Sequence, residues 1–376
     1  MAATRLLVAL IAVLPLTATA KILPEDRSDV LWHVYDGGGV TIQGPSVLVR
    51  KAYKEKVSVW GNYYVDMISG ASIDVQATAS EYAEEREEVS VGVDYLHEKT
   101  IMGLAFTHSE ESDYLAETVH FSISQDFFGD LTTLSLGYGF GDDTVMRNGD
   151  ADFEASATHQ TLRVELSQIL TRNLIMNLGV ETVADEGYLN NPYRSVRFVD
   201  SDAASGFSYQ AERYPQTRTS DAVALRAMYY LPWRAAIRGE YRRYVDSWGI
   251  AGDNVEISFT QPVGERWEFD VSVRHYAQEG ADFYADIFPY RDAANFLARD
   301  KELSTFTNLG VGFGVGYTFS KNGFWVFRSG SVNAHVDWMS FDYDDFSDVT
   351  TGAALGAEPG YGLDAIVGRV FVSLWF

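Results

Sequence analysis

Alternation of apolar with polar or small side chains recurs along this chain of 376 residues and limits its fold more than any other feature. Between residues 309 and 319 every odd position is apolar, and the even positions from 310 to 316 are all glycine. The stretches 119–124, 134–140 and 162–167 alternate in the same way. Because successive side chains of a β-strand point to opposite faces, these stretches predict strands with two different faces.

The stretch 366–376, IVGRVFVSLWF, has the length and the apolar parity of a strand that crosses a membrane. A tilted membrane-spanning strand needs about 9–11 residues with one lipid-like face. The alternative is an ordinary core strand of a soluble sheet. A charged side chain facing lipid at mid-depth costs roughly 2–4 kcal/mol. We therefore expect the polar parity of every strand to face a lumen.

Short turn signals alternate with longer polar connections, which is the hairpin pattern of an antiparallel barrel. The short turns are 54–56, 97–99, 128–130, 171–173, 231–234, 263–266 and 321–323, and the longer connections are 68–88, 109–115, 141–158, 185–219, 247–252, 278–304 and 343–360. With a first strand at 30–36, which turns through Gly37–Gly39 into 40–53, the count is sixteen. Fourteen is the alternative. The prediction is an all-β, up-and-down transmembrane barrel with both termini in the periplasm.

The N-terminal stretch 1–20 has a basic residue, an apolar run and the small residues Ala18-Thr19-Ala20, as a cleavable signal peptide does. We expect export, and then a mature barrel over 21–376 in the outer membrane of a Gram-negative bacterium. The chain contains no cysteine, which is compatible with an oxidising periplasm. Its formal charge of −24 argues against nucleic-acid binding, because phosphate recognition needs a basic excess.

The inner parity of the central strands carries fixed charge. Such charges could favour anions in a channel, because rings of pore charges set selectivity. They could equally pair across neighbouring strands and fill the lumen. The candidates are Arg163, Glu165, Glu181, Arg226, Arg234, Arg238, Glu240, Arg242, Asp270 and Arg274.

The connection 278–304 is too long to be a simple link inside a compact domain. Ala293, Phe296, Leu297 and Asp300 fall at helical spacing, which predicts a short amphipathic helix. The segment could enter the barrel as a constriction or form an external cap. The same two options apply to 185–219.

Acidic residues gather at 81–88 and 342–348, which we interpret as solvated loops. Oxygen ligands for Ca²⁺ could come from Asp142, Asp143, Asn148, Asp150 and Asp152, although their spacing is not that of an EF-hand. No other metal or cofactor is predicted. The sequence has no GxSxG or HExxH motif. An enzyme on the barrel rim, built around a residue such as His335 between Asn333 and Asp337, therefore has no support from spacing.

Four stretches resemble a family of bacterial outer-membrane β-barrels known as domain of unknown function DUF3570: 38–45, 124–142, 190–197 and 298–306. The terminal Phe376 also resembles the ending of such barrels. The family has no established activity, so the resemblance carries over no catalytic residue. Its members are encoded near periplasmic thioredoxin-like and flavin-transferase proteins, which implies an envelope partner of redox or flavin chemistry.

Two of these stretches lie in long loops. A loop that only connects strands needs no particular sequence, so we expect these loops to recognise something outside the barrel. The loop-recognition candidates are Tyr193, Arg194, Arg197, Arg299, Asp300, Lys301 and Glu302. The predicted function is a channel for small solutes with an arginine-rich lumen and a constriction at 278–304. A filled barrel that serves as a scaffold for periplasmic proteins is the alternative, and a rim enzyme is third.

Overall fold

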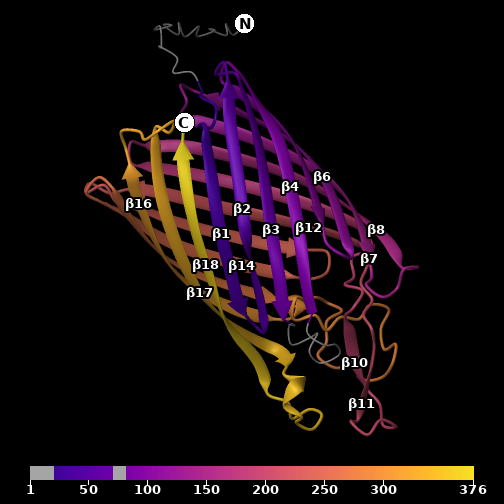
Figure 1. The fold of residues 1–376 in the computed structure, drawn as a ribbon. Coiled ribbons are helices and arrows are strands. Elements are labelled where there is room, and N and C mark those ends of the chain that lie inside the picture. The colour runs from indigo at the N-terminus through magenta and orange to yellow at the C-terminus, as the bar shows by residue number, and fades with distance from the viewer. Residues whose placement is uncertain (1–20, 71–81) are drawn as a thin grey trace, which may run out of the picture.

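The computed structural model describes residues 21–70 and 82–376. Over these residues, sixteen strands close into one antiparallel barrel, and β10 and β11 form a separate hairpin (Figure 1). The predicted signal peptide, 1–20, lies outside the described residues. The elements are β1 (Arg27–Gly37), β2 (Val40–Tyr53), β3 (Val57–Gly70), β4 (Tyr82–His97), β5 (Thr100–Glu110), β6 (Tyr114–Phe127), β7 (Thr132–Met146), β8 (Glu154–Thr171), β9 (Leu174–Gly187), β10 (Ser195–Val199), β11 (Phe207–Ala211), β12 (Thr217–Tyr230), β13 (Ala236–Asp246), β14 (Ala251–Val263), β15 (Trp267–Glu279), η1 (Lys301–Leu303), β16 (Phe306–Ser320), β17 (Ser329–Ser347), η2 (Val349–Thr351) and β18 (Gly360–Trp375).

Pairing of the first strand with the last closes the barrel. β1 runs antiparallel to β18, with Val30 opposite Val372, and each remaining strand pairs with its neighbours in the wall. Closure leaves no strand edge with unpaired backbone groups, which is a requirement for a sheet inside a membrane. The predicted count of sixteen strands, with its first strand near residues 30–36, is therefore confirmed.

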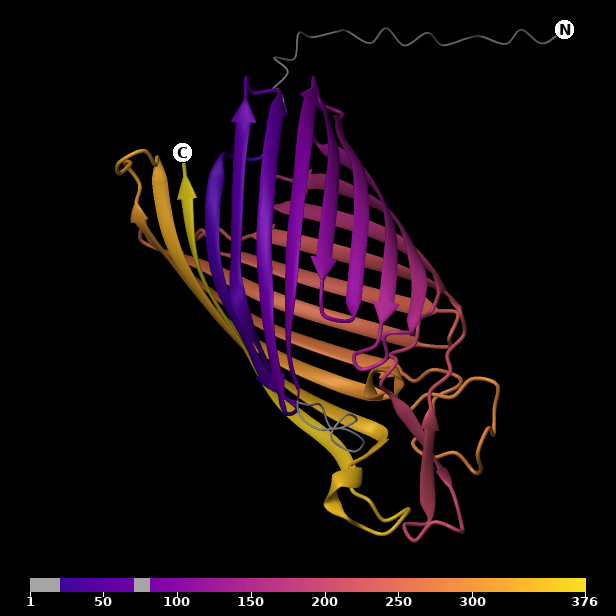
Figure 2. The ribbon, with the colours of Figure 1, turned by 45° about the vertical axis from the view of Figure 1, so that its right-hand side comes forward.

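The barrel has two different ends. The short turns, residues 21–26 and Phe376 lie at one end, which we call the turn end; the Phe376 amide donates to the Asp26 carbonyl at 3.2 Å. The opposite end, the loop end, carries the β10–β11 hairpin and the long connections (Figures 1 and 2). A two-residue turn is an exception at the loop end: Gly38 and Gly39 join β1 to β2 with φ of 60° and 81°, values that a type I′ turn requires.

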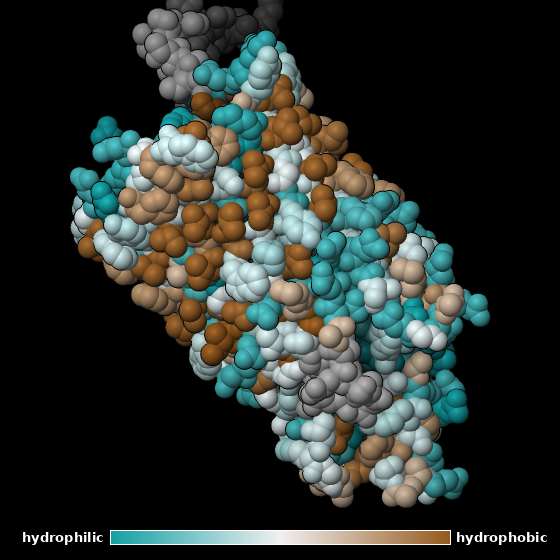
Figure 3. All heavy atoms as spheres, in the orientation of Figure 1, coloured by the Kyte–Doolittle hydropathy of each residue, from teal (hydrophilic) through white to brown (hydrophobic). Residues whose placement is uncertain are grey.

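The outer face of the wall is apolar. Val119, Phe121 and their counterparts on other strands are 36% exposed or more, as side chains facing lipid should be. Figure 3 shows such side chains in brown over the part of the wall where β1, β2, β17 and β18 lie. Among the described residues, no helix has the length and apolar character needed to cross a membrane.

Inward-facing glycines make room for polar neighbours. A Cβ on Gly314 of β16 would collide with the imidazole of His335 on β17, and one on Gly312 would collide with Asp337 and Ser272. The inner parity of β16 is therefore bare because bulky groups from adjacent strands lean over it.

Three sequence predictions about the connections are wrong. Strands extend beyond the expected boundaries, so the acidic residues 84–88 lie in β4, and Asp342, Asp344 and Asp345 lie in β17. Segment 278–304 contains a three-residue 3₁₀ helix, η1, in place of the expected amphipathic helix. Arg234 lies in the turn between β12 and β13, with a φ of 72°, and not on the strand with Arg238.

Candidate functional site: the lumen and its loop end

Ion pairs between strands that are not neighbours identify the inner face. The guanidinium of Arg226 on β12 lies 3.7 Å from Glu165 on β8, and Arg242 on β13 lies 3.2 Å from Glu181 on β9. Each pair reaches across an intervening strand. Side chains can do this only on the concave side of a curved sheet, so these charges lie on the inner face of the wall.

The predicted charges of β8, β9, β12 and β13 form two groups of ion pairs that border the same hollow, and we call the two groups together the charge network. Arg163 also binds Glu181, while Arg226 and Arg238 share Glu240 at 2.7 and 3.1 Å. The arginine side chains nevertheless stay 34–57% exposed. Beside this network is a hollow of about 260 Å³ whose floor consists of small residues, Gly179, Ala222 and Ala224.

The remaining lumen candidates lie outside this network. Arg274 of β15 donates to Asn254 at 2.6 Å, and Asp270 accepts from the hydroxyl of Thr260. Arg234, in its turn, donates to the carbonyl of Gly264 at 3.4 Å. Glu256, which the sequence analysis missed, lies opposite Arg274 in the β14–β15 register. The inner face is therefore more nearly neutral than the arginine count indicates.

A segment at the turn end also reaches the inner wall. Residues 21–26 precede β1, yet the Lys21 ammonium lies 3.1 Å from Asp126 and 2.8 Å from the Ser124 hydroxyl. Both acceptors belong to the inner parity of β6, and four strands separate β1 from β6 in the wall. The segment, which we call the N-terminal strap, thus passes from one side of the barrel to another. Sequence reasoning did not find it.

At the loop end, the connections pack into a folded body that we call the loop cluster (residues 188–216, 280–305 and 343–359). Val196, Phe198, Phe288 and Leu297 form one of its cores. Backbone hydrogen bonds join its segments, as where Arg213 and Leu297 exchange bonds of 2.8 and 2.9 Å.

Buried ion pairs hold the loop cluster together. Arg197 and Arg299, whose side chains are 1% and 4% exposed, both bind the carboxylate of Asp286. Arg197 also binds Glu358 at 2.5 Å, and the Arg299 guanidinium lies 4.3 Å from the centre of the Phe346 ring. These arginines were predicted to recognise something outside the protein. The structure directs both of them to other parts of the same chain.

The other loop candidates are placed differently. Arg194 and Asp300 form an ion pair, so the two family-like loop stretches contact each other. Tyr193 lies apart, where its hydroxyl binds Asp113 and the backbone N–H of Asn148. Lys301 and Glu302 belong to η1.

The η1 helix lies at the mouth of the barrel (Figure 2). A hollow of about 320 Å³ separates it from the wall: Asp300, Glu302 and Leu303 line one side, and His159 and Arg218 are among the residues of the other. The carboxylates of Asp143 and Asp185 hold His159 from both ring nitrogens, each at 2.8 Å. Residues 300–303 of the loop cluster are thus inside the mouth, and the rest of segment 278–304 packs in the outer part of the cluster.

A buried carboxyl group lies between these two parts. Glu212 accepts hydrogen bonds from the Tyr214 hydroxyl at 2.5 Å and the Arg299 amide at 2.6 Å. Burial raises the pKa of Glu212 to about 7, although both hydrogen bonds act in the opposite direction.

The five predicted calcium ligands do not converge. Asp142 and Asp143 lie in β7, where Asp143 binds Tyr114 and His159. Asp150 binds Arg147, and Asn148 donates to Ser112. Within residues 21–70 and 82–376, no three His, Asp or Glu side chains gather in a way that could hold a metal ion.

A closed sixteen-stranded antiparallel barrel with an apolar exterior and a charged interior has the architecture of an outer-membrane β-barrel. The chain matches the family "Protein of unknown function (DUF3570)" over residues 75–332, which is more than half of its length. It belongs to that family.

No curated protein is similar enough in sequence to count as a match. Among solved structures, the chain is similar to a bacterial polysaccharide outer membrane secretin (9% identity, TM-score 0.48, covering 94% of this chain and 99% of that one). It is also similar to the monoaromatic hydrocarbon channel CymD (9%, 0.46, 94% and 89%) and to OmpT of Vibrio cholerae (10%, 0.42, 94% and 100%). All three TM-scores lie below 0.5.

Proposed function

We propose that the barrel is a channel for small polar solutes across the outer membrane. The observation that supports this best is the charge network on β8, β9, β12 and β13, whose arginine side chains stay 34–57% exposed on an inner wall with a floor of small residues. Exposed donors beside glycine and alanine suit a wetted path better than a packed core. Because glutamates pair with the arginines, we expect only a modest preference for anions.

The proposed channel would be narrowed at both ends of the barrel. Residues 300–303 lie opposite His159 and Arg218 at the loop end, and the N-terminal strap reaches β6 at the turn end. The predicted constriction by 278–304 then involves only residues 300–303, because the rest of that segment packs in the outer part of the loop cluster.

Arg238→Ser tests the channel with little structural disturbance. Arg238 shares Glu240 with Arg226, so its removal leaves the carboxylate paired and changes only the lumen charge. We expect the reversal potential of planar bilayers under a salt gradient to shift toward cation preference. Arg243→Ser is the matched control, because Arg243 follows on the same strand with the opposite parity and pairs with Asp253. Bilayers that stay silent with the wild-type protein would contradict the proposal.

The second candidate is a scaffold for periplasmic proteins, including the redox or flavin-related partners that the family resemblance implies. Its support is the cross-strand pairing of Arg163, Arg226 and Arg242, which also fills part of the lumen. Silent bilayers together with crosslinking of the turn end to one defined periplasmic protein would favour it.

A further inference from the structure

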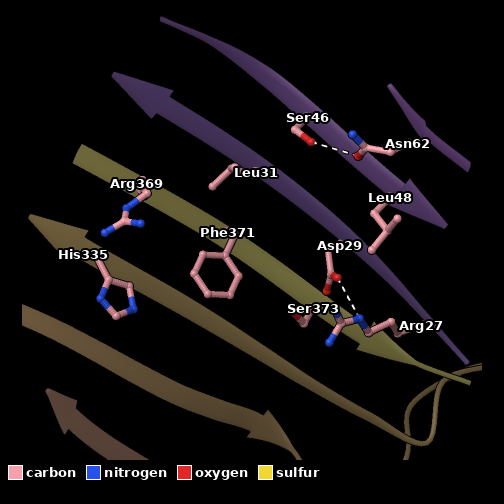
Figure 4. A pocket seen from close by; sticks show the side chains of 10 residues that line it. All are labelled: Arg27, Asp29, Leu31, Ser46, Leu48, Asn62, His335, Arg369, Phe371 and Ser373. Atoms are coloured by element: carbon pink, nitrogen blue, oxygen red, sulfur yellow. Dashed lines mark hydrogen bonds and ion pairs between the residues drawn. The ribbon is translucent and has the colours of Figure 1, made fainter. Parts of the chain in front are cut away.

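An amphiphilic cavity lies in the inner wall where β1, β2, β3, β17 and β18 meet (Figure 4). We call it the seam cavity, because β1 and β18 close the barrel there. Its volume is about 520 Å³, within the range of roughly 300–1,000 Å³ found for small-molecule pockets. Its lining residues are Arg27, Asp29, Leu31, Ser46, Leu48, Asn62, His335, Arg369, Phe371 and Ser373.

The inner-facing positions of the strands are mostly polar, but at the seam cavity several of them carry apolar side chains. Leu31, Leu48 and Phe371 point into the cavity from three strands and are only half-buried. The imidazole of His335 lies parallel to the Phe371 ring, with 6.1 Å between centroids and 6° between planes. A ligand that covered this surface would gain about 25 cal/mol per Å² of apolar area removed from water. The parallel rings suit a flat, aromatic ligand.

Two guanidinium groups flank the apolar surface. Figure 4 shows Phe371 between Arg369 and Arg27. Arg369 binds Asp337 at 2.6 Å and Arg27 binds Asp29 at 2.9 Å, yet their side chains are 48% and 45% exposed. A guanidinium has five N–H donors, so one carboxylate does not exhaust either group. Because Asp29 is already bound to Arg27, the donors that remain favour an anion, and a carboxylate fits their planar geometry.

We propose that the seam cavity binds a small aromatic carboxylate, with its ring against Phe371 and Leu48 and its carboxylate on Arg369. The inference rests on the proposed channel and deepens it, because it names a substrate class. The site would raise the local concentration of such solutes inside the lumen without any covalent step.

Benzoate is the probe, titrated by calorimetry into the full-length barrel in detergent. We expect benzoate to bind at least tenfold more tightly than acetate, which lacks the ring, or benzyl alcohol, which lacks the charge. Arg369→Gln and Phe371→Ser should each weaken benzoate binding by about tenfold or more, because each removes one half of the recognition. Arg86→Gln is the control. Arg86 and its partner Glu88, 2.8 Å away, both lie on β4 outside the seam cavity, so this variant should bind benzoate as the wild type does.

Absence of benzoate binding, equal binding of acetate, or binding that neither cavity variant weakens would overturn the site. Bilayer conductance of the same preparation separates this failure from that of the channel. Conductance without benzoate binding would contradict the proposed binding site and support the channel. Benzoate binding in a barrel that does not conduct would support the binding site and contradict the channel. A folded-barrel band shift on gels verifies that each variant is folded.

Discussion

Arg197 illustrates how a single residue holds the loop end together. Its side chain is 1% exposed, and its partners Asp286 and Glu358 come from connections 89 and 161 residues away in sequence. A charge this deeply buried persists only when opposite charges compensate it. Burial acts to lower the pKa of Arg197, but the hydrogen bonds and charges of the two carboxylates outweigh it and hold the pKa above its ordinary value.

Arg197→Gln should loosen the loop cluster and leave the barrel intact. Removing one partner of a buried ion pair costs about 3–5 kcal/mol, because the other charge stays buried and uncompensated. We expect proteases to cut residues 188–216 much faster in the variant. Arg213→Gln is the control, since Arg213 pairs with Asp292 at an exposed position. Equal cutting rates in both variants would contradict this role for Arg197.

Glu212 should make the loop cluster sensitive to pH. Its pKa is about 7 in the folded cluster against an ordinary value of 4.5, so the folded state holds a proton that the opened state releases. Its stabilising contribution is therefore full below about pH 4.5, falls as pH rises through 7, and changes no further above that.

Hydrogen exchange of amides 297–304, corrected for the intrinsic effect of pH, should be faster at about pH 8 than at about pH 5. Glu212→Gln should remove most of this difference, because a glutamine keeps the hydrogen bonds to Tyr214 and Arg299 without titrating. Asp300 and Arg194 also face Glu212 and should contribute less. The same pH dependence in wild type and variant would contradict the assignment to Glu212.

At the scale of elements, the strands could be predicted and the loops could not. Alternation located strands such as 119–124 because successive side chains of every strand in the wall face lipid and lumen in turn. In segment 278–304 the helical spacing had another cause. Leu297 and Ala298 are both fully buried in hydrophobic cores of the loop end, and their backbones bond to Arg213 and Phe283 in place of the hydrogen bonds of a helix.

Gly314→Val should weaken the wall between β16 and β17. The new side chain would collide with His335, and overpacking of this kind costs typically about 1–3 kcal/mol. Gly137→Val is the control on the inner face of β7, where the nearest group to a Cβ is Arg163 at 3.9 Å. The midpoint of urea unfolding, followed by the folded-barrel band shift on gels, should fall in Gly314→Val only. Equal midpoints would show that His335 moves aside without cost.

Release of the N-terminal strap should widen the turn end. Asp126→Asn removes the ion pair with Lys21, whereas Lys99→Gln removes the pair with Asp130, which lies at the same end and does not involve the strap. We expect single-channel conductance to rise in Asp126→Asn and to stay unchanged in Lys99→Gln. A conductance that is identical in all three proteins would mean that the strap does not narrow the route.

At the scale of the whole molecule, the closed barrel followed from two sequence features together. Hairpin signals fixed which strands are neighbours, and the even strand number of such barrels required a first strand near 30–36, which pairs with β18. The seam cavity had no comparable signal. Leu31 and Leu48 lie on the β1–β2 hairpin, and Phe371, from the far end of the sequence, meets them only because the first and last strands become neighbours on closure.

Alternation of lipid and lumen contact along one strand is the claim on which everything else depends. The chain has no cysteine, so single cysteines at 332–337 of β17 can carry a spin label in reconstituted liposomes. We expect labels at Val332, Ala334 and Val336 to be reached by oxygen dissolved in lipid, and labels at Asn333, His335 and Asp337 by a water-soluble nickel complex. Accessibility that fails to alternate, or that alternates in the opposite sense, would contradict the account.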